Sequence, residues 1–301
     1  METPGTIPLP AQVKLLPGQG GLPKLAIQTG RSTAEIYLHG AHLTGFQKNG
    51  EPPLLFMSAA SRYEVNQPIR GGVPVVFPWF GPRAGQPAHG FARQTLWKLE
   101  AATAEKSGDV KVSLRLPETA APADWRTAQV RFVVTVGDKL MMELTVTNLS
   151  PERSLSFENC LHTYFAVGDI AAVTITGLQG AAYIDKVAGA ATKPERGAAI
   201  AISSEVDRVF LNAAGPVEIH DRQLRRTIVV EKSGSASTVV WNPWMAKSKA
   251  MPDFGDEEFK QMVCVESGNI AENQITLPPG KTATMKVLLG TRQEQHAESK
   301  M

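Results

Sequence analysis

The sequence predicts an all-β protein, built as a large antiparallel β-sandwich. Apolar and polar residues alternate with a period of two along much of the chain, which is typical of half-buried strands. Helical periodicity is scarce, and no G-x-G-x-x-G sequence opens a helix, which argues against alternating strand–helix folds. Many short strands with few helices favour a large sandwich or barrel.

The alternation is clearest near the middle of the chain. Residues 110–116 alternate strictly, and residues 128–136 and 139–148 flank a Gly137-Asp138 turn, which predicts a hairpin. Residues 252–260 are compatible with one acidic helical turn. Further strands are expected at residues 35–40, 173–176, 199–203, 217–220, 227–231, 238–241, 262–266 and 282–289.

Composition indicates a globular protein without a polyanionic partner. The 301 residues are 43% hydrophobic and 20% charged, enough to build a core without disulfides or metal. The net charge of +2 and the absence of long basic runs argue against nucleic acid or an anionic membrane as partner. Cys160 and Cys264 are too few for a secreted disulfide framework, so we expect buried free thiols.

The chain is expected to form one domain. We predict a flexible N-terminal segment at residues 1–20, a single β-sandwich domain at 21–291 and a polar tail at 292–301. Residues 187–200 are expected to form a surface loop. There is no signal peptide pattern and no apolar stretch of the ~20 residues that span a bilayer. We therefore expect a soluble, cytoplasmic monomer.

Two irregular segments carry candidate binding residues. In residues 66–82, the prolines cannot donate to a strand ladder, and Gly71-Gly72 allows a close backbone approach directly after Arg70. The alternative is an irregular sheet edge with a solvated arginine. In the second segment, His89 and Arg93 flank a small turn, and His89 alone could be an ordinary turn residue.

Two apolar strands carry candidate proton-transfer residues. If residues 157–165 form a strand, Cys160, His162 and Tyr164 share one face, where a histidine needs a hydrogen-bond partner. The alternative is a satisfied core histidine. Glu266 ends the apolar strand 262–266, so it either points to water or lines a cleft with a raised pKa suited to proton transfer. Trp241 offers a flat ring for a sugar.

Together these segments resemble the glucose-6-phosphate 1-epimerases, the hexose-6-phosphate branch of the aldose 1-epimerase (galactose mutarotase) superfamily. The matching motifs follow the family order over about residues 35–290. They are Arg70-Gly-Gly-Val-Pro, Phe77-Pro, His89-Gly-Phe-Ala-Arg93, Leu161-His162, Asp207-Arg208, Trp241-Asn242-Pro243 and Val263-Cys-Val-Glu266. Each motif is weak alone, but the ordered set is specific.

The resemblance implies a β-sandwich of supersandwich type that acts without a metal or organic cofactor. It implies His162 as general acid and Glu266 as general base. It also implies a sugar phosphate as substrate. The substrate-binding residues that it implies are Arg70, Arg93 and Asp207, with His89 lining the same cleft. The chain departs from the family at Ala88, where a glutamine is usual, and Gln86 could replace that hydrogen bond.

The implied chemistry suits these residues. Anomerisation removes a proton from O1 of the sugar and adds one to the ring oxygen, so one base and one acid suffice. We expect Glu266 with a mildly raised pKa and a protonated His162, whose ordinary pKa is ~6.5. Arginines bind phosphate through bidentate bonds, while Lys247 and Lys249 either assist or are solvated. The alternatives are a non-catalytic carbohydrate-binding sandwich and a mutarotase for unphosphorylated aldoses.

Overall fold

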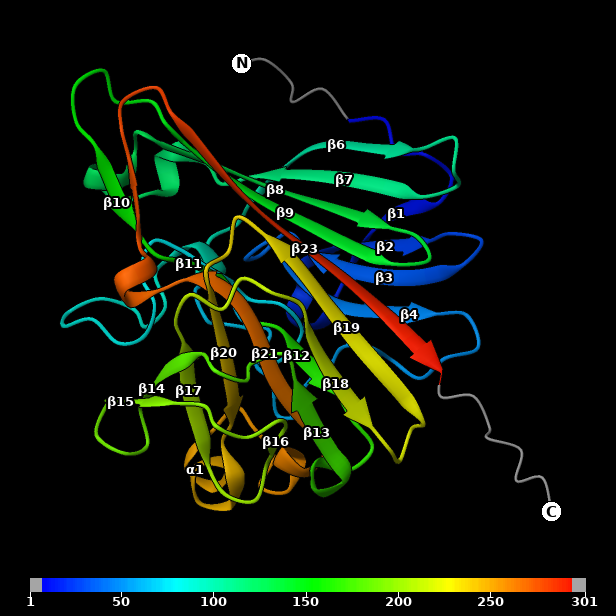
Figure 1. The fold of residues 1–301 in the computed structure, drawn as a ribbon. Helices are drawn as coiled ribbons and strands as arrows, with labels where there is room; N and C mark the ends of the chain where they lie inside the picture. Colours follow the sequence, from blue (N-terminus) through cyan, green and yellow to red (C-terminus); the bar gives the residue numbers. More distant parts are fainter. Residues whose placement is uncertain (1–6, 294–301) are drawn as a thin grey trace.

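The computed structural model describes residues 7–293 and confirms the predicted all-β architecture (Figure 1). Two large antiparallel sheets dominate it. The nine-stranded sheet has the order β16 (Ile200–Ala201), β13 (Val173–Thr176), β18 (Val217–Asp221), β19 (Arg226–Ser233), β23 (Thr282–Gln293), β9 (Leu140–Asn148), β8 (Ala128–Val136), β7 (Val110–Arg115) and β6 (Lys98–Ala104).

The eight-stranded sheet carries the candidate site. Its order is β15 (Ala191–Pro194), β14 (Ala182–Asp185), β17 (Val206–Phe210), β20 (Ser237–Asn242), β21 (Met262–Asn269), β11 (Asn159–Leu161) and β5 (Val75–Val76), with β12 (Tyr164–Ala166) also paired to β21. Two smaller sheets are formed by β1 (Val13–Pro17), β2 (Pro23–Gln28), β3 (Ser32–Tyr37) and β4 (His42–Lys48), and by β10 (Leu155–Phe157) with β22 (Ile275–Leu277).

The predicted hairpin at 128–148 is confirmed as β8 and β9, in register from Ala128 opposite Asn148 to Val136 opposite Leu140. Strands that are buried on both faces were harder to delimit. Every residue of β20 and β21 is buried, so their sequences lack alternation. The predicted end of the strand at Glu266 is therefore wrong, because β21 continues to Asn269.

Other boundaries also differ from the prediction. The stretch 157–165 is broken into β10, β11 and β12, and β15 lies within the predicted loop 187–200. Within 252–260, helical structure is limited to the start of a short 3-10 helix (Glu258–Gln261), whereas the helix α1 (Trp244–Ala250) was not predicted. No helix of residues 7–293 is long and apolar enough to cross a membrane.

The predicted domain limits need correction at both ends. Within the segment 1–20, residues 13–17 form β1, which pairs with β2, and β23 runs to Gln293, beyond residue 291. Only Val13 of β1 is buried, which explains the weak pattern in the sequence. Residues 1–6 of the first segment and 294–301 of the tail lie outside the described residues.

The main core lies between the two large sheets. One apolar cluster combines residues of the nine-stranded sheet, such as Val134 and Leu144, with Phe165 and Val265 of the eight-stranded sheet. Residues one position away along β12 and β21 point to the opposite face, since side chains alternate along a strand. That opposite face holds the candidate site.

Within residues 70–93, the backbone passes close to itself next to the site, where Gly90 meets Phe77. Gly90 adopts a φ of +74° and forms a parallel bridge with Phe77. A Cβ on Gly90 would lie 2.0 Å from the carbonyl oxygen of Phe77, closer than any real contact. Gly85 has a similar φ of +68°, but a Cβ added there would have no atom within 4 Å. The two glycines therefore separate the cost of backbone conformation from that of a steric clash.

We predict that Gly90→Ala destabilises the protein more than Gly85→Ala does. Both changes place alanine in the left-handed region, which costs about 1–2 kcal/mol. Gly90→Ala must also displace a backbone carbonyl, which adds about 1–3 kcal/mol by analogy with overpacked cores. Urea unfolding of both variants measures the difference. Equal unfolding free energies would show that the carbonyl of Phe77 moves away from the added Cβ at no cost in stability.

Candidate active site

The register of β21 against β11 and β12 builds the site. Two pairs of opposed residues define that register. They are Leu161 with Ser267, and Tyr164 with Cys264. Counting inward from either pair places His162 directly opposite Glu266, although the ladder is interrupted there. The backbone N–H of His162 donates instead to the carbonyl oxygen of Pro74, at 3.1 Å. Opposed residues have Cβ atoms about 4.5–5.5 Å apart, so register alone brings this pair together.

The same face continues across the neighbouring strands. Trp241 of β20 pairs with Cys264, and Asp207 of β17 pairs with Trp241. The backbone N–H of Lys186, just after β14, donates to the carbonyl oxygen of Asp207 at 2.9 Å. Lys186 thereby extends the row by one strand. Residues far apart in sequence thus form one polar and aromatic floor.

A cavity of about 260 Å³ opens above this floor. It is lined by Arg70, Phe80, Gly81, Pro82, His89, His162, Tyr164, Lys186, Asp207, Val239, Trp241, Lys247, Met251 and Glu266. Five of the six predicted site residues therefore meet at one cavity. The sixth, Arg93, is buried and is not part of the lining. The volume is slightly below the ~300 Å³ at the lower end of small-molecule pockets, which suits a single sugar ring.

His162 and Glu266 are in direct contact at the cavity floor. Nε2 of His162 lies 3.3 Å from Oε1 of Glu266, and their side chains are 9% and 1% exposed. The thiol of Cys160 donates to Oε2 of Glu266 at 3.4 Å. The His162 ring stacks on Tyr164, with centroids 4.9 Å apart and planes at 14°. The predicted shared face of Cys160, His162 and Tyr164 is therefore present despite the broken strand.

Burial sets the protonation of this pair. It raises the pKa of Glu266 well above its ordinary value, with the charge of Asp207 acting in the same direction. Burial also lowers the pKa of His162 well below 6.5, reinforced by the positive charges of Arg93 and Arg70. The free protein therefore favours a neutral pair that holds one proton. This differs from the protonated His162 that we expected, because desolvation disfavours the imidazolium.

The two arginines have different settings. Nε of Arg70 donates to Asp253 at 3.2 Å and Nη1 donates to the hydroxyl of Tyr164 at 3.0 Å. Burial alone would lower the pKa of Arg70, but Tyr164 and Asp253 outweigh it and raise the pKa. Nη2 of Arg93 donates to the carbonyl oxygen of Ala88 at 2.8 Å, and its Nε has no partner among the described residues. Burial lowers the pKa of Arg93 to about 10.

His89 enters the cavity from the loop that precedes Gly90. Its backbone φ is +64°, and its ring lies edge-on to His162 with centroids 5.5 Å apart. The backbone N–H of Gly81 donates to Nδ1 of His89 at 3.3 Å, which assigns the ring proton to Nε2. Burial, with Arg93 next, lowers the pKa of His89 well below 6.5. His89 is thus a neutral hydrogen-bond donor.

Lys186 is the charged lining residue that the sequence analysis missed. Its Nζ lies 4.5 Å from the ring centroid of Phe80, and none of the ion pairs among residues 7–293 includes it. Lys247 also lines the cavity, but its Nζ binds Glu205 at 2.9 Å. Lys249 and Gln86 are exposed and do not line it. The strand before Lys186 was not predicted, so no pattern placed this lysine.

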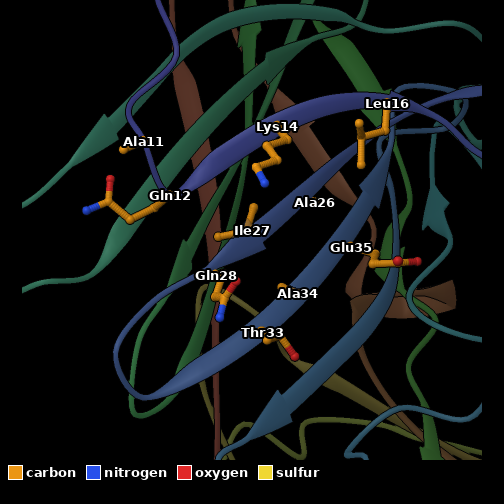
Figure 2. Close-up of a pocket in the computed structure, with 10 residues that line it drawn as sticks. All are labelled: Ala11, Gln12, Lys14, Leu16, Ala26, Ile27, Gln28, Thr33, Ala34 and Glu35. Atoms are coloured by element: carbon orange, nitrogen blue, oxygen red, sulfur yellow. The ribbon is translucent and has the colours of Figure 1, made fainter.

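A larger cavity of about 540 Å³ lies along β1, β2 and β3 (Figure 2). Its ten lining residues include only two titratable side chains, Lys14 and Glu35. Glu35 is bound by Lys24 at 2.6 Å. Because no acid–base pair converges there, we place the candidate active site in the smaller cavity.

Comparisons with known proteins show which family the chain is similar to. Residues 23–290 match the family model described as aldose 1-epimerase. A protein of Cenchrus ciliaris named "putative glucose-6-phosphate 1-epimerase" is 35% identical, covering 89% of this chain and 84% of its own length. A Salmonella typhimurium protein of the same name is 37% identical, covering 78% and 79%.

Solved structures share the fold. A Salmonella typhimurium crystal structure described as a "putative mutarotase" superposes with a TM-score of 0.82 at 29% identity, covering 93% of this chain and 97% of its own. The galactose 1-epimerase of Lactobacillus acidophilus has a TM-score of 0.71 at 14% identity, covering 96% and 100%. At that identity the second likeness shows the fold alone.

Proposed function

The chain belongs to the aldose 1-epimerase family, and we propose that it interconverts the α and β anomers of a hexose 6-phosphate, with glucose 6-phosphate as the preferred substrate. The observation that carries this proposal is the contact between His162 and Glu266 at the floor of a cavity sized for one sugar ring. Relatives named for glucose-6-phosphate 1-epimerase support the choice of substrate.

The pair carries the protons that ring opening requires. Glu266 as base removes the proton from O1, and His162 as acid delivers one to the ring oxygen, so the bond between C1 and the ring oxygen breaks. Rotation about C1–C2 presents the other face of the aldehyde, and the same two residues return the protons as the ring closes. The sugar exchanges only protons with the protein and is neither oxidised nor reduced, so the reaction needs no electron carrier. Asp207 accepts hydrogen bonds from sugar hydroxyls, and His89 donates through Nε2.

Two cations that line the cavity suit the phosphate. Arg70 is held by Asp253 and Tyr164 with its guanidinium at the wall, while Lys186 has no competing carboxylate partner among the described residues. We therefore assign the first phosphate contacts to Arg70 and Lys186. Arg93 lies behind the lining. Its positive charge acts on the phosphate at longer range, unless the loop at 88–93 moves and brings the guanidinium into the cavity.

Phosphate binding also helps the proton transfer. Burial lowers the pKa of His162 in the free protein, and Arg93 and Arg70 lower it further. A phosphate dianion beside these cations offsets their charge, which favours the imidazolium. The proton of Glu266 then crosses the 3.3 Å contact to His162, and this produces the carboxylate base and the imidazolium acid together. The substrate thereby activates the pair.

Two alternatives remain testable. A non-catalytic carbohydrate-binding sandwich would bind glucose 6-phosphate without accelerating the polarimetric relaxation of the freshly dissolved α anomer. A mutarotase for unphosphorylated aldoses would show no preference for the phosphate. Both free thiols are compatible with a reducing compartment, so we propose a cytoplasmic location. The expected monomer stays a prediction.

We predict that Glu266→Gln lowers kcat by about 10²–10⁴-fold, the usual contribution of a positioned acid–base group. The amide keeps the size of the side chain but cannot accept the O1 proton. Polarimetry with α-glucose 6-phosphate measures the rate, and a change in the intrinsic tryptophan fluorescence, to which Trp241 at the cavity contributes, checks that the sugar still binds. Near-normal turnover in this variant would remove Glu266 from the base role.

We predict that Arg70→Ala and Lys186→Ala each raise KM for glucose 6-phosphate by about 10–100-fold. A hydrogen bond to a charged group contributes about 1.5–3 kcal/mol, and about 1.4 kcal/mol is tenfold in affinity. Lys249→Ala, an exposed lysine outside the lining, is the matched control and should leave KM unchanged. If Arg70→Ala and Lys186→Ala leave KM unaltered, the substrate is an unphosphorylated sugar.

We predict a pH profile with its acid limb below pH 6.5. The active form holds one proton on the pair, and acid adds a second when His162 becomes charged. Since burial and the arginines lower the pKa of His162, that step in kcat/KM lies below its ordinary value. In kcat, which reports the substrate complex, the bound phosphate moves the acid limb to higher pH. An acid limb of kcat/KM at or above pH 6.5 would contradict the neutral pair.

A further inference from the structure

A third side chain joins the proton-transfer pair. Cys264 lies two residues before Glu266 on β21, so both point to the same face of the strand. His162 lies opposite on the neighbouring chain segment. Each of these three buried residues offers one ligand atom, and the three atoms lie within 4.8 Å of one another. Cys264 and Glu266 on β21, with His162 opposite them, therefore form a compact set of three donor atoms.

The donor set has the chemistry of a transition-metal site. Imidazole nitrogen, thiolate sulfur and carboxylate oxygen are the three ligand types of zinc in proteins. Sites with three protein ligands leave a fourth position for water or substrate. Here the cavity supplies that position, because both His162 and Glu266 line it. The thiol of Cys264 makes no hydrogen bond among residues 7–293, so a metal would displace no existing partner of its sulfur.

Charge balance permits a divalent ion among the nearby cations. An ion of charge two that displaces one proton from the thiol and one from the carboxyl leaves the net charge of the cluster unchanged. Arg70 and Lys186 therefore oppose the occupied cluster no more than the protonated one. The ion reaches the cluster through the cavity, where the His162 side chain is 9% exposed.

We propose that His162, Cys264 and Glu266 bind a zinc ion, which inhibits the enzyme. The ion occupies the nitrogen lone pair and the carboxylate oxygen that the sugar must meet, and it competes with substrate for the cavity floor. The binding site stands on the three ligands alone. The inhibition rests on the proposed mutarotase function. Cys264 has no part in the proton transfer, so it separates metal binding from catalysis.

The test compares two thiol variants of the full chain. Zinc should inhibit the mutarotation of glucose 6-phosphate by the wild-type protein, and a chelator should restore activity. Cys264→Ala should keep its activity without zinc but raise the inhibition constant by about 100-fold or more, since even outer-shell partners are worth about 10–100-fold in metal affinity. Cys160→Ala removes a hydrogen bond to the ligand Glu266 but no ligand, so it should raise the inhibition constant less than Cys264→Ala does.

Cobalt provides a readout that does not depend on activity. Titration of the metal-free protein with Co²⁺ should produce a thiolate-to-cobalt charge-transfer band in the near ultraviolet, which Cys264→Ser abolishes, Glu266→Gln weakens and Cys160→Ala retains. Absence of the band in the wild type, or equal zinc sensitivity of Cys264→Ala and wild type, would overturn the site. A chain that shows the band without mutarotase activity would retain the site and reject only the proposed function.

Discussion

The alignment of β21 with the segment 159–166 is the constraint on which the site depends. It sets His162 opposite Glu266, with Tyr164 opposite Cys264. The pairing of β21 with β20, and of β20 with β17, then places Trp241 and Asp207 in the same row as Cys264. Because side chains alternate along a strand, a slip of one residue would turn Glu266 into the apolar core and expose Val265 to the cavity. The register is fixed by that core, where Phe165 and Val265 pack between the sheets. Packing on one face therefore positions chemistry on the other.

Burial is the second determinant of the chemistry. A carboxyl that is 1% exposed and an imidazole that is 9% exposed would each be costly as isolated ions. Their contact at 3.3 Å lets one proton satisfy both, and burial, reinforced by the surrounding cations, lowers the pKa of the imidazole so that it stays neutral in the free protein. In the proposed mechanism, a dianionic substrate therefore contributes more than its own binding contacts.

Sequence patterns predicted the fold class well and the fine structure unevenly. Alternation identified β7, β8 and β9, because one face of each is buried and the other is not. β20 and β21 are buried throughout, so their apolar runs indicated strands but gave no signal for where they end. Of the six site residues that the ordered motifs predicted, five line the same cavity. Lys186 was missed because it follows an unpredicted strand, and the lowered pKa of His162 follows from burial and nearby guanidinium groups that only three-dimensional placement reveals.

The sealed floor beneath His162 and Glu266 has a consequence for how the site resets. In the proposed mechanism, each proton taken from the sugar during opening is returned during closure, so a complete cycle leaves the two side chains as they began. The site needs no water wire to recharge it, and no conformational excursion to reach bulk solvent. A centre that restores its own protonation in this way can lie on a buried floor, where Glu266 is 1% exposed, and still turn over as sugar enters and leaves.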